Sequence, residues 1–282
     1  MKYRHSFHAG NFADVHKHVT LLALLGALRR KDKGFLYLDT HAGRGIYDLS
    51  GAQPEAAAGI GQFLAGAPRA AELQHYAEVI AGFRARRERR LLYPGSPLIA
   101  AGELRPQDRA VLVESQPLEA RALEAALACA PDGTRTHVER GDGFERLRAW
   151  LPPPERRGLT FLDPPYEETR EDFARVAAAI AEGLKRFATG VIAAWYPIKE
   201  ERVTAAWQAE LARAIAAPLL ASELWLHPRD SRVALNGSGL LIVNPPYLTA
   251  ERMQLWLPEL LQHLAAGPAA GSSVRMLSQS PP

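Results

Sequence analysis

Four strand-like segments of the chain each run into acidic or glycine-rich residues. The segment 35–40 (FLYLDT) leads into the turn HAGRG, and three further apolar segments end at Glu114, at Asp142–Gly143 and at the run Asp163-Pro164-Pro165-Tyr166. In a parallel sheet the carboxyl ends of the strands meet at one edge, and ligands bind outside that edge. We therefore expect these four groups of residues to form a single ligand site.

The run Asp163-Pro164-Pro165-Tyr166 predicts the most specific chemistry. The exocyclic amine of adenine is a poor nucleophile, because its lone pair is delocalised into the ring. The carboxylate of Asp163 and the backbone carbonyl of Pro164 can each accept one N–H of such an amine and so localise the lone pair on nitrogen. The prolines hold the carbonyl in place, and Tyr166 offers a face on which a base can stack. The run therefore predicts transfer of a methyl group from a sulfonium to an amine, by positioning and electrostatics.

The three earlier groups predict the methyl donor. Glu114 can accept hydrogen bonds from two ribose hydroxyls, Asp142 can accept from an adenine amine, and Gly143 permits the close approach of a ligand. The turn lacks the third glycine of a dinucleotide site, since Asp48 stands there, and no G-x-x-x-x-G-K-[ST] phosphate loop occurs. A nucleoside without phosphates fits, and we expect S-adenosylmethionine. Taken singly, Glu114 could equally be a surface residue, and the glycine turn could be purely structural.

A second match, Asn244-Pro245-Pro246-Tyr247, has the same logic with an amide in place of the carboxylate. We favour Asp163 as the catalytic residue, because its strand should lie beside the glycine turn, whereas the last strand should lie towards the border of the sheet. The second run is interpreted as the exit of a strand. The alternative is methylation of a protein glutamine, which would be lost in Asn244→Ala and kept in Asp163→Ala.

A regular alternation of strands and helices must position these residues. We expect a helix after the N-cap Asn11, a helix over 251–263, and strands, with helices between them, over 35–40, 110–115, 136–144, 158–166, 190–198, 221–227 and 238–247. This alternation predicts an α/β fold with a mostly parallel sheet of seven strands, covered on both faces. Residues 46–93 carry no convincing strand and are expected to form an inserted helical subdomain. The main domain then comprises 1–45 and 94–264, and 265–282 is expected to be a disordered tail.

Composition excludes several classes of protein. With 282 residues, of which 47% are hydrophobic and 23% charged, the chain is typical of a globular protein and not of a disordered or fibrous one. A single cysteine, Cys129, excludes an internal disulfide, and we expect a cytoplasmic protein without signal peptide or membrane span. The net charge is +3, and the run RARRERR (84–90) is either a phosphate-contact surface for a nucleic acid or a solvated helix face.

Longer motifs narrow the prediction. The N-terminal YRHSFHAGNFADVHKH, with FLYLDTHAG, YPGSPLIA, RGLTFLDPPY and KRFATG, is similar to the bacterial 23S ribosomal RNA adenine-N6 methyltransferases of the RlmJ family, and the similarity extends over residues 1–262. It implies a Rossmann-like, class I methyltransferase that uses S-adenosylmethionine and carries a small helical insertion. It also implies a monomer that acts on 23S ribosomal RNA free of ribosomal proteins. The shorter, Arg-richer insertion and the tail depart from the family pattern.

The resemblance also implies roles for particular residues. Asp163, Pro164 and Tyr166 are expected to be catalytic, and Tyr3 is expected to reach towards the target nucleotide. The residues expected to line the cofactor are His18, His41, Ser96, Glu114, Asp142, Gly143 and Asp163. No metal is expected, since the N-terminal histidines have no cysteine near them. Two alternatives remain: adenine-N6 methylation of DNA, and a nucleic-acid-binding module without catalysis.

Overall fold

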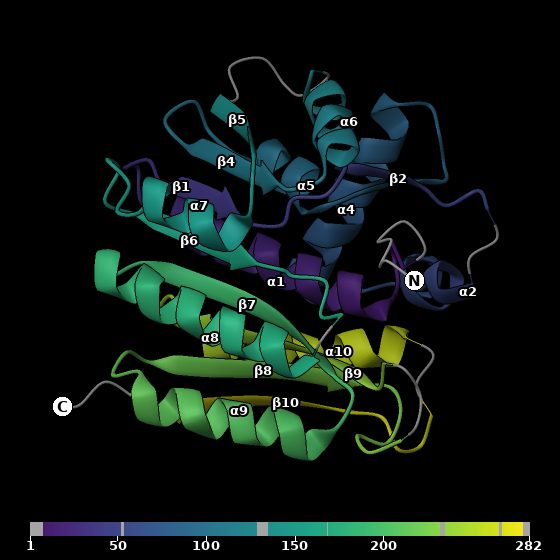
Figure 1. The fold of residues 1–282 in the computed structure, drawn as a ribbon. Helices are drawn as coiled ribbons and strands as arrows, with labels where there is room; N and C mark the ends of the chain where they lie inside the picture. Colours follow the sequence, from purple (N-terminus) through teal and green to yellow (C-terminus); the bar gives the residue numbers. More distant parts are fainter. Residues whose placement is uncertain are drawn as a thin grey trace.

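The centre of the molecule is a sheet of eight strands, counted over the residues that the computed structural model describes, 8–51, 54–128, 135–167, 169–231, 235–264 and 267–278 (Figure 1). In chain order the strands are β1 (Leu36–Asp39), β4 (Arg109–Glu114), β5 (Arg135–Arg140), β6 (Gly158–Leu162), β7 (Val191–Ile198), β8 (Leu219–Trp225), β9 (Gly237–Val243) and β10 (Gly271–Ser278). Their order across the sheet is β10-β8-β9-β7-β6-β1-β4-β5.

Five neighbouring strands run in one direction. β7, β6, β1, β4 and β5 are parallel, whereas β9 is antiparallel to both β7 and β8, and β10 is antiparallel to β8. The parallel strands therefore end at one edge, the carboxyl edge, and begin at the opposite one, the amino edge. All seven predicted strands are present, so the predicted mostly parallel α/β sheet is confirmed, with one further strand added.

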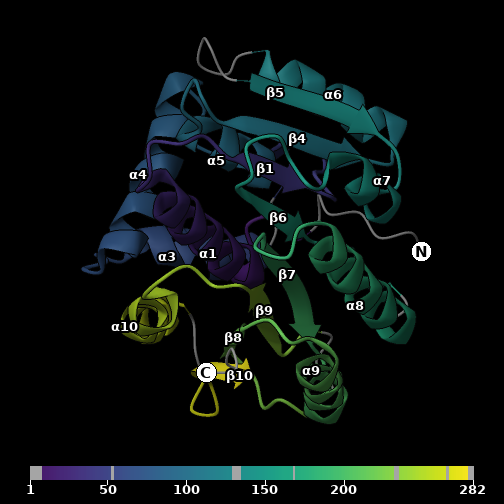
Figure 2. The same cartoon turned by 90° about the vertical axis from the view of Figure 1, so that its left-hand side faces the viewer.

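Helices cover both faces of the sheet (Figure 2). The first face carries α1 (Phe12–Arg29), α5 (Ser96–Glu103), α6 (Pro117–Leu127) and α10 (Thr249–His263); the second carries α7 (Gly143–Trp150), α8 (Thr169–Arg186) and α9 (Glu201–Ala214). Phe35 and Tyr37 pack into the core under the first layer, and Leu36 and Leu38 into the core under the second. Burial on both sides explains why the strand is apolar throughout, and the architecture is Rossmann-like.

The segment 46–93 holds short helices between two short strands. The strands are β2 (Ile46–Asp48) and β3 (Leu92–Pro94), and the helices are α2 (Pro54–Ala56), the π-helix η2 (Ala57–Gly61), α3 (Gln62–Ala65) and α4 (Ala71–Arg86). The expectation of no strand is wrong at both ends, where β2 and β3 pair antiparallel. Strands of three residues leave little periodic signal in a sequence. The division of the chain into a main domain and an inserted subdomain stays a prediction.

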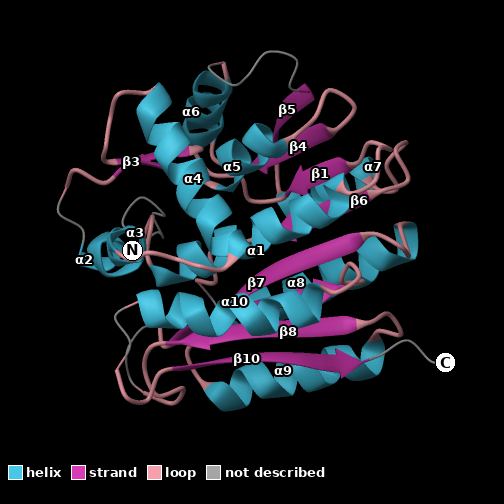
Figure 3. Ribbon diagram, turned by 180° about the vertical axis from the view of Figure 1, so that it is seen from behind, coloured by secondary structure: helices cyan, strands magenta, loops and turns pink. Residues whose placement is uncertain are grey.

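Residues 271–278 correct the expectation of a disordered tail over 265–282. They form β10, which pairs with β8 at the border of the sheet (Figure 3). Arg275 of β10 donates to the buried carboxylate of Glu223 on β8 at 3.1 Å, and the hydroxyl of Ser278 donates to the Ala217 carbonyl at 3.0 Å. The small, polar composition of the tail does not reveal this long-range ion pair, which ties the strand to the sheet.

We predict that Glu223→Ala destabilises the fold. The side chain is 2% exposed, and it accepts hydrogen bonds from Arg229, Arg275, Gln208 and Tyr196. Breaking a buried ion pair typically costs about 3–5 kcal/mol, and the partial exposure of Arg275 favours the lower end, roughly 3 kcal/mol. Thermal unfolding should show a Tm lower by several degrees, with the exposed Glu210→Ala on α9 as the matched control. A Tm within about one degree of wild type would contradict this account.

Candidate active site

The acidic residues that follow neighbouring parallel strands meet at the carboxyl edge. Asp39, the last residue of β1, pairs in register with Phe161 of β6 on one side and with Leu112 of β4 on the other. Asp163 follows β6 directly, and Glu114 is the last residue of β4. The expected convergence of these strand ends is confirmed. The roles of the individual side chains stay predictions.

A lysine that was not among the expected residues lies at the centre of this edge. The ammonium group of Lys17 on α1 donates to Asp163 Oδ2 at 2.6 Å and lies 2.8 Å from Asp14 Oδ1. The side chain is only 5% exposed. Burial by itself would lower the pKa of Lys17, but the two carboxylates outweigh it, so the pKa is raised well above its ordinary value. Lys17 is therefore a fixed cation that holds one oxygen of Asp163.

The local sequence explains how α1 delivers this lysine. Asn11 is the N-cap, as expected, and its side chain accepts from the Asp14 amide. Asp14 in turn accepts from the Gly10 amide at 2.9 Å, so the carboxylate is held before it meets Lys17. The available signal in the sequence was an Asp–Lys pair at i, i+3 near the start of a largely apolar helix.

The turn after β6 has one residue in a strained conformation. Tyr166 has φ +49°, a left-handed value that is rare outside glycine and frequent at functional sites. Its hydroxyl donates to the Trp195 carbonyl at 2.7 Å, and its ring packs edge-on against Phe173 and Trp195. The side chain is 2% exposed. In this conformation Tyr166 presents no open face to a base, because neighbouring aromatic rings cover it.

Asp39 is buried beneath the site. Its Oδ2 accepts from the Ser96 hydroxyl at 2.7 Å and from the Tyr37 hydroxyl at 2.8 Å. Burial raises the pKa of Asp39 to about 6; the two hydroxyl donors oppose this rise and the charge of Asp163 adds to it. Ser96 is therefore bound to Asp39, and a contact of Ser96 with the cofactor stays a prediction.

The glycine turn after β1 is joined to the end of β4. Gly43 and Gly45 have φ of +65° and +78°, which favours glycine. The Gly43 amide donates to one oxygen of Glu114 at 2.8 Å, and the Gln116 amide donates to the other at 2.7 Å. Glu114 is thus held at the expected place. Its Oε1 also accepts from the Ser115 hydroxyl at 3.5 Å, whereas Oε2 keeps a lone pair for a further donor.

Asp142 and Gly143 already have structural roles, in addition to the contacts with the cofactor that we expect of them. Asp142 is the N-cap of α7, where Oδ1 accepts from the Phe144 amide at 2.8 Å, and Oδ2 accepts from Arg175 at 2.8 Å. A Cβ on Gly143 would lie 1.8 Å from the Thr40 carbonyl oxygen. Glycine is therefore required there by the packing of α7 on the turn after β1.

The two histidines expected to meet the cofactor lie in different environments. His18 is buried, and its Nδ1 lies 2.7 Å from the Tyr93 hydroxyl, which connects α1 to β3. His41 is half-buried, with Nδ1 2.8 Å from the Thr40 hydroxyl. Burial lowers the pKa of His41 to about 4, so its ring is neutral at physiological pH. A neutral imidazole can donate to a carboxylate, but it adds no charge.

The second Pro-Pro run is at the opposite edge of the sheet. β9 lies between β7 and β8 rather than near the border, so the expected reason for setting this run aside is wrong. The direction of the strand separates the two runs: Val243, at the end of β9, pairs with Ile192 near the start of β7. The amide of Asn244 donates to the carbonyls of Ala188 and Gly190 at 2.8 and 2.9 Å, and so ties together two loops.

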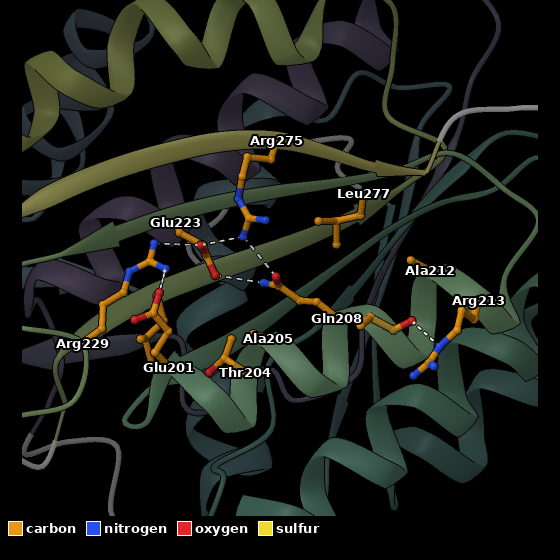
Figure 4. A pocket seen from close by; sticks show the side chains of 12 residues that line it. Glu201, Thr204, Ala205, Gln208, Ala212, Arg213, Glu223, Arg229, Arg275 and Leu277 are labelled. Carbon is orange, nitrogen blue, oxygen red and sulfur yellow. Dashed lines mark hydrogen bonds and ion pairs between the residues drawn. The ribbon is translucent and has the colours of Figure 1, made fainter.

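A cavity of about 580 Å³ lies between α9 and strands β8 and β10 (Figure 4). Glu223, Arg229, Arg275 and Gln208 contribute its polar side chains, and the alanines of α9 form an apolar wall. It contains no residue expected to act on the cofactor or the base. The expected chemistry is at the carboxyl edge, where Lys17 and Asp163 meet.

Several expectations receive no further detail. Tyr3 and Cys129 lie outside the described residues. Among the residues whose placement is described, no three His, Cys, Asp or Glu side chains are grouped as a metal site would need. In the same part of the chain, no helix combines the length and apolar character needed to cross a bilayer.

The pH dependence of stability tests the burial of Asp39. Its pKa is about 6 in the folded protein, against the ordinary 3.8. Between these values the folded state binds the proton more tightly than the unfolded state. The free energy of unfolding therefore falls as the pH rises through this window, by up to roughly 3 kcal/mol.

In Asp39→Asn this fall is absent, so the variant should gain stability relative to wild type as the pH rises. Urea unfolding at about pH 4.5 and about pH 7 measures the difference, and the lost hydrogen bonds only add a constant. A difference between the two proteins that does not change with pH would contradict the assignment.

Comparison with known proteins identifies the family. The family profile described as Ribosomal RNA large subunit methyltransferase D, RlmJ, matches residues 32–277. Two relatives named Ribosomal RNA large subunit methyltransferase J are similar: the Escherichia coli (strain K12) protein is 41% identical over 92% of each chain, and the Haemophilus influenzae protein is 39% identical over 94% of each. A crystal structure of a Legionella pneumophila protein matches with a TM-score of 0.85 at 35% identity, over 95% of this chain and 98% of that one. The chain is therefore an enzyme that belongs to the RlmJ family of ribosomal RNA large subunit methyltransferases.

Proposed function

We propose that this enzyme transfers a methyl group from S-adenosylmethionine to N6 of an adenine in 23S ribosomal RNA, on RNA free of ribosomal proteins. We infer that it acts as a monomer in the cytoplasm. The observation that carries the chemistry is Asp163, held by Lys17 at the carboxyl edge and followed by the Pro164 carbonyl. The relatives named ribosomal RNA large subunit methyltransferase J support the choice of RNA.

The donor groups at the carboxyl edge fit S-adenosylmethionine. Glu114 Oε2 keeps a lone pair for a ribose hydroxyl, and Asp142 stands where an adenine amine could donate. The described acidic groups at this edge suit hydroxyl and amine donors rather than phosphates. When bound, S-adenosylmethionine supplies a methyl group made electrophilic by a sulfonium.

The residues of the chain would do the rest by holding the amine. Lys17 occupies Asp163 Oδ2, which leaves Oδ1 to accept one N–H of the target amine, and the Pro164 carbonyl accepts the other. Asp163 would take up the surplus proton of the methylated amine. The ammonium of Lys17 fixes the orientation of this carboxylate.

A different aromatic residue is better placed than Tyr166 to contact the base. Trp195 is half-buried, and its ring centroid lies 5.5 Å from Lys17 Nζ. Tyr166 packs edge-on behind it at 5.6 Å. We infer that Trp195 forms a wall of the base pocket, and that Tyr166 contacts the base only if its ring moves. A paired adenine would first have to leave its stack.

The arginine run 84–90 is our candidate for contacts with RNA phosphates. It begins in the last turn of α4 and continues beyond it, and β3 connects it to Ser96 beside Asp39. Arg86 and Arg90 are exposed, whereas Arg89 pairs with Asp48 at 2.7 Å. Exposed guanidinium groups near a catalytic site suit backbone contacts that carry no sequence code.

Transfer of a tritiated methyl group tests the proposal. Protein-free 23S ribosomal RNA should be labelled, with assembled subunits and duplex DNA as comparison substrates, and mass spectrometry of digested RNA should identify N6-methyladenosine. Asp163→Ala should lose at least about a hundredfold of the rate, as expected for a positioned acceptor. Asn244→Ala is the matched control and should keep the rate at saturating RNA. Label entering DNA alone, or a fully active Asp163→Ala, would contradict the proposal.

Lys17→Met tests the buried cation separately. Without the ammonium, Asp14 and Asp163 become two neighbouring buried carboxylates, and one of them takes up a proton. We expect a rate about a hundredfold lower at neutral pH, with partial recovery at higher pH. The double variant Lys17→Met, Asp14→Asn leaves one carboxylate and should be faster than the single variant. Equal rates in the two variants, at equal folded fractions, would show that Lys17 does not act through Asp163.

A further inference from the structure

The second Pro-Pro run holds an aromatic side chain out in solvent. Tyr247 is 83% exposed at the amino edge, opposite the catalytic residues. Two prolines and the paired amide of Asn244 fix the turn, and Leu248 after it adopts a left-handed φ of +63°. A strand can end without a rigid turn that exposes a tyrosine. Because this turn is rigid, little conformational entropy is lost when a partner stacks on the ring.

One cation lies beside this ring, and two more follow that cation in the chain. Arg30 lines the same small hollow as Tyr247, between α1 and α10, and Lys31 and Lys33 follow it in the chain. All three are exposed, and none makes an ion pair with a residue that the structure describes. The only acidic residue within 30–34 is Asp32.

Two further arginines hold these cations in place. Arg105 donates to the carbonyls of Arg29 and Lys31 at 3.2 and 3.0 Å, and Arg157 donates to the carbonyls of Leu28 and Lys33. The loop after α1 is therefore held in place by two arginines, of which Arg105 is itself paired with Asp108 at 2.8 Å. The exposed cations Arg30, Lys31 and Lys33 attract a polyanion.

We propose that Arg30, Lys31, Lys33 and Tyr247 form a second RNA contact, here called the amino-edge patch. The three cations bind phosphates, and an unpaired base stacks on Tyr247. This second contact rests on the proposed function, in which RNA is the substrate. It adds a region of RNA that the enzyme binds away from the methylated adenine. Exposed cations beside an exposed aromatic ring suit a single-stranded or looped RNA better than an acidic protein, which offers no bases to stack.

Geometry sets how long the RNA must be. Arg30, the C-cap of α1, is thirteen residues beyond Lys17, so the amino-edge patch is roughly 20 Å from Lys17 at 1.5 Å per residue. α1 and α10 lie on the same face of the sheet (Figures 2 and 3). A single strand of RNA could therefore cross that face between Asp163 and the amino-edge patch. A fragment trimmed closely around the methylated adenine would not reach the patch.

Methylation kinetics with the full-length enzyme and protein-free 23S ribosomal RNA test the amino-edge patch. Tyr247→Ala should raise KM for the long RNA about tenfold, the usual size of one lost stacking contact, with the loss in KM rather than kcat. The triple variant Arg30→Gln, Lys31→Gln, Lys33→Gln should reduce the salt dependence of RNA binding, lowering the log–log slope by about 2. Neither variant should change KM for a short fragment around the methylated adenine, or the affinity for S-adenosylmethionine.

Two controls match these variants in exposure and charge. Leu255→Ala removes an exposed apolar side chain from α10, and Arg121→Gln, Arg135→Gln, Lys185→Gln removes three exposed cations elsewhere. Both should behave as wild type. The inference is overturned if both patch variants keep the KM and the salt slope of the wild-type enzyme. This holds also if the variants lose binding to a protein while their RNA kinetics stay unchanged. If the wild-type enzyme does not methylate RNA, the proposed function fails first, which is a different result.

Discussion

The ammonium group of Lys17 is buried between Asp14 and Asp163, and a buried cation persists only while its anions stay in place. Moving the turn after β6 away from α1 would therefore remove one of the two anions of this buried cation. Asn11 and the Gly10 amide hold the other end of this chain of contacts. The position of the Asp163 carboxylate is in this way set by a helix far from it in sequence.

The other acidic residues of the carboxyl edge are also fixed by groups of the protein, here by hydrogen-bond donors rather than by a buried cation. Glu114 accepts from two backbone amides, Asp142 caps α7, and Asp39 accepts from two hydroxyl groups. Each carboxylate is already oriented before any ligand arrives, so little conformational entropy is lost on binding. The glycines serve this arrangement, since a side chain at Gly143 would separate α7 from the turn after β1.

The sequence predicted what depends on local pattern and missed what depends on distant partners. Periodicity identified the seven strands and the convergence of their acidic ends, because both follow from chain direction in an α/β fold. It missed Lys17, whose partner Asp163 is 146 residues away, and β10, which Arg275 ties to Glu223. It also gave Tyr166 an open face, although Phe173 and Trp195 cover the ring; such packing cannot be inferred from a four-residue motif.

The most direct test is a crystal structure of the enzyme with S-adenosylhomocysteine and an adenosine-containing RNA. The account predicts that Asp163 Oδ1 and the Pro164 carbonyl oxygen both lie within about 3.2 Å of the adenine N6, while Lys17 still holds Oδ2. It also predicts that the sulfur of S-adenosylhomocysteine lies on the side of N6 that faces away from these two oxygens, in line for transfer. A complex in which these two oxygens face away from the base, or in which Lys17 leaves Asp163, would contradict it.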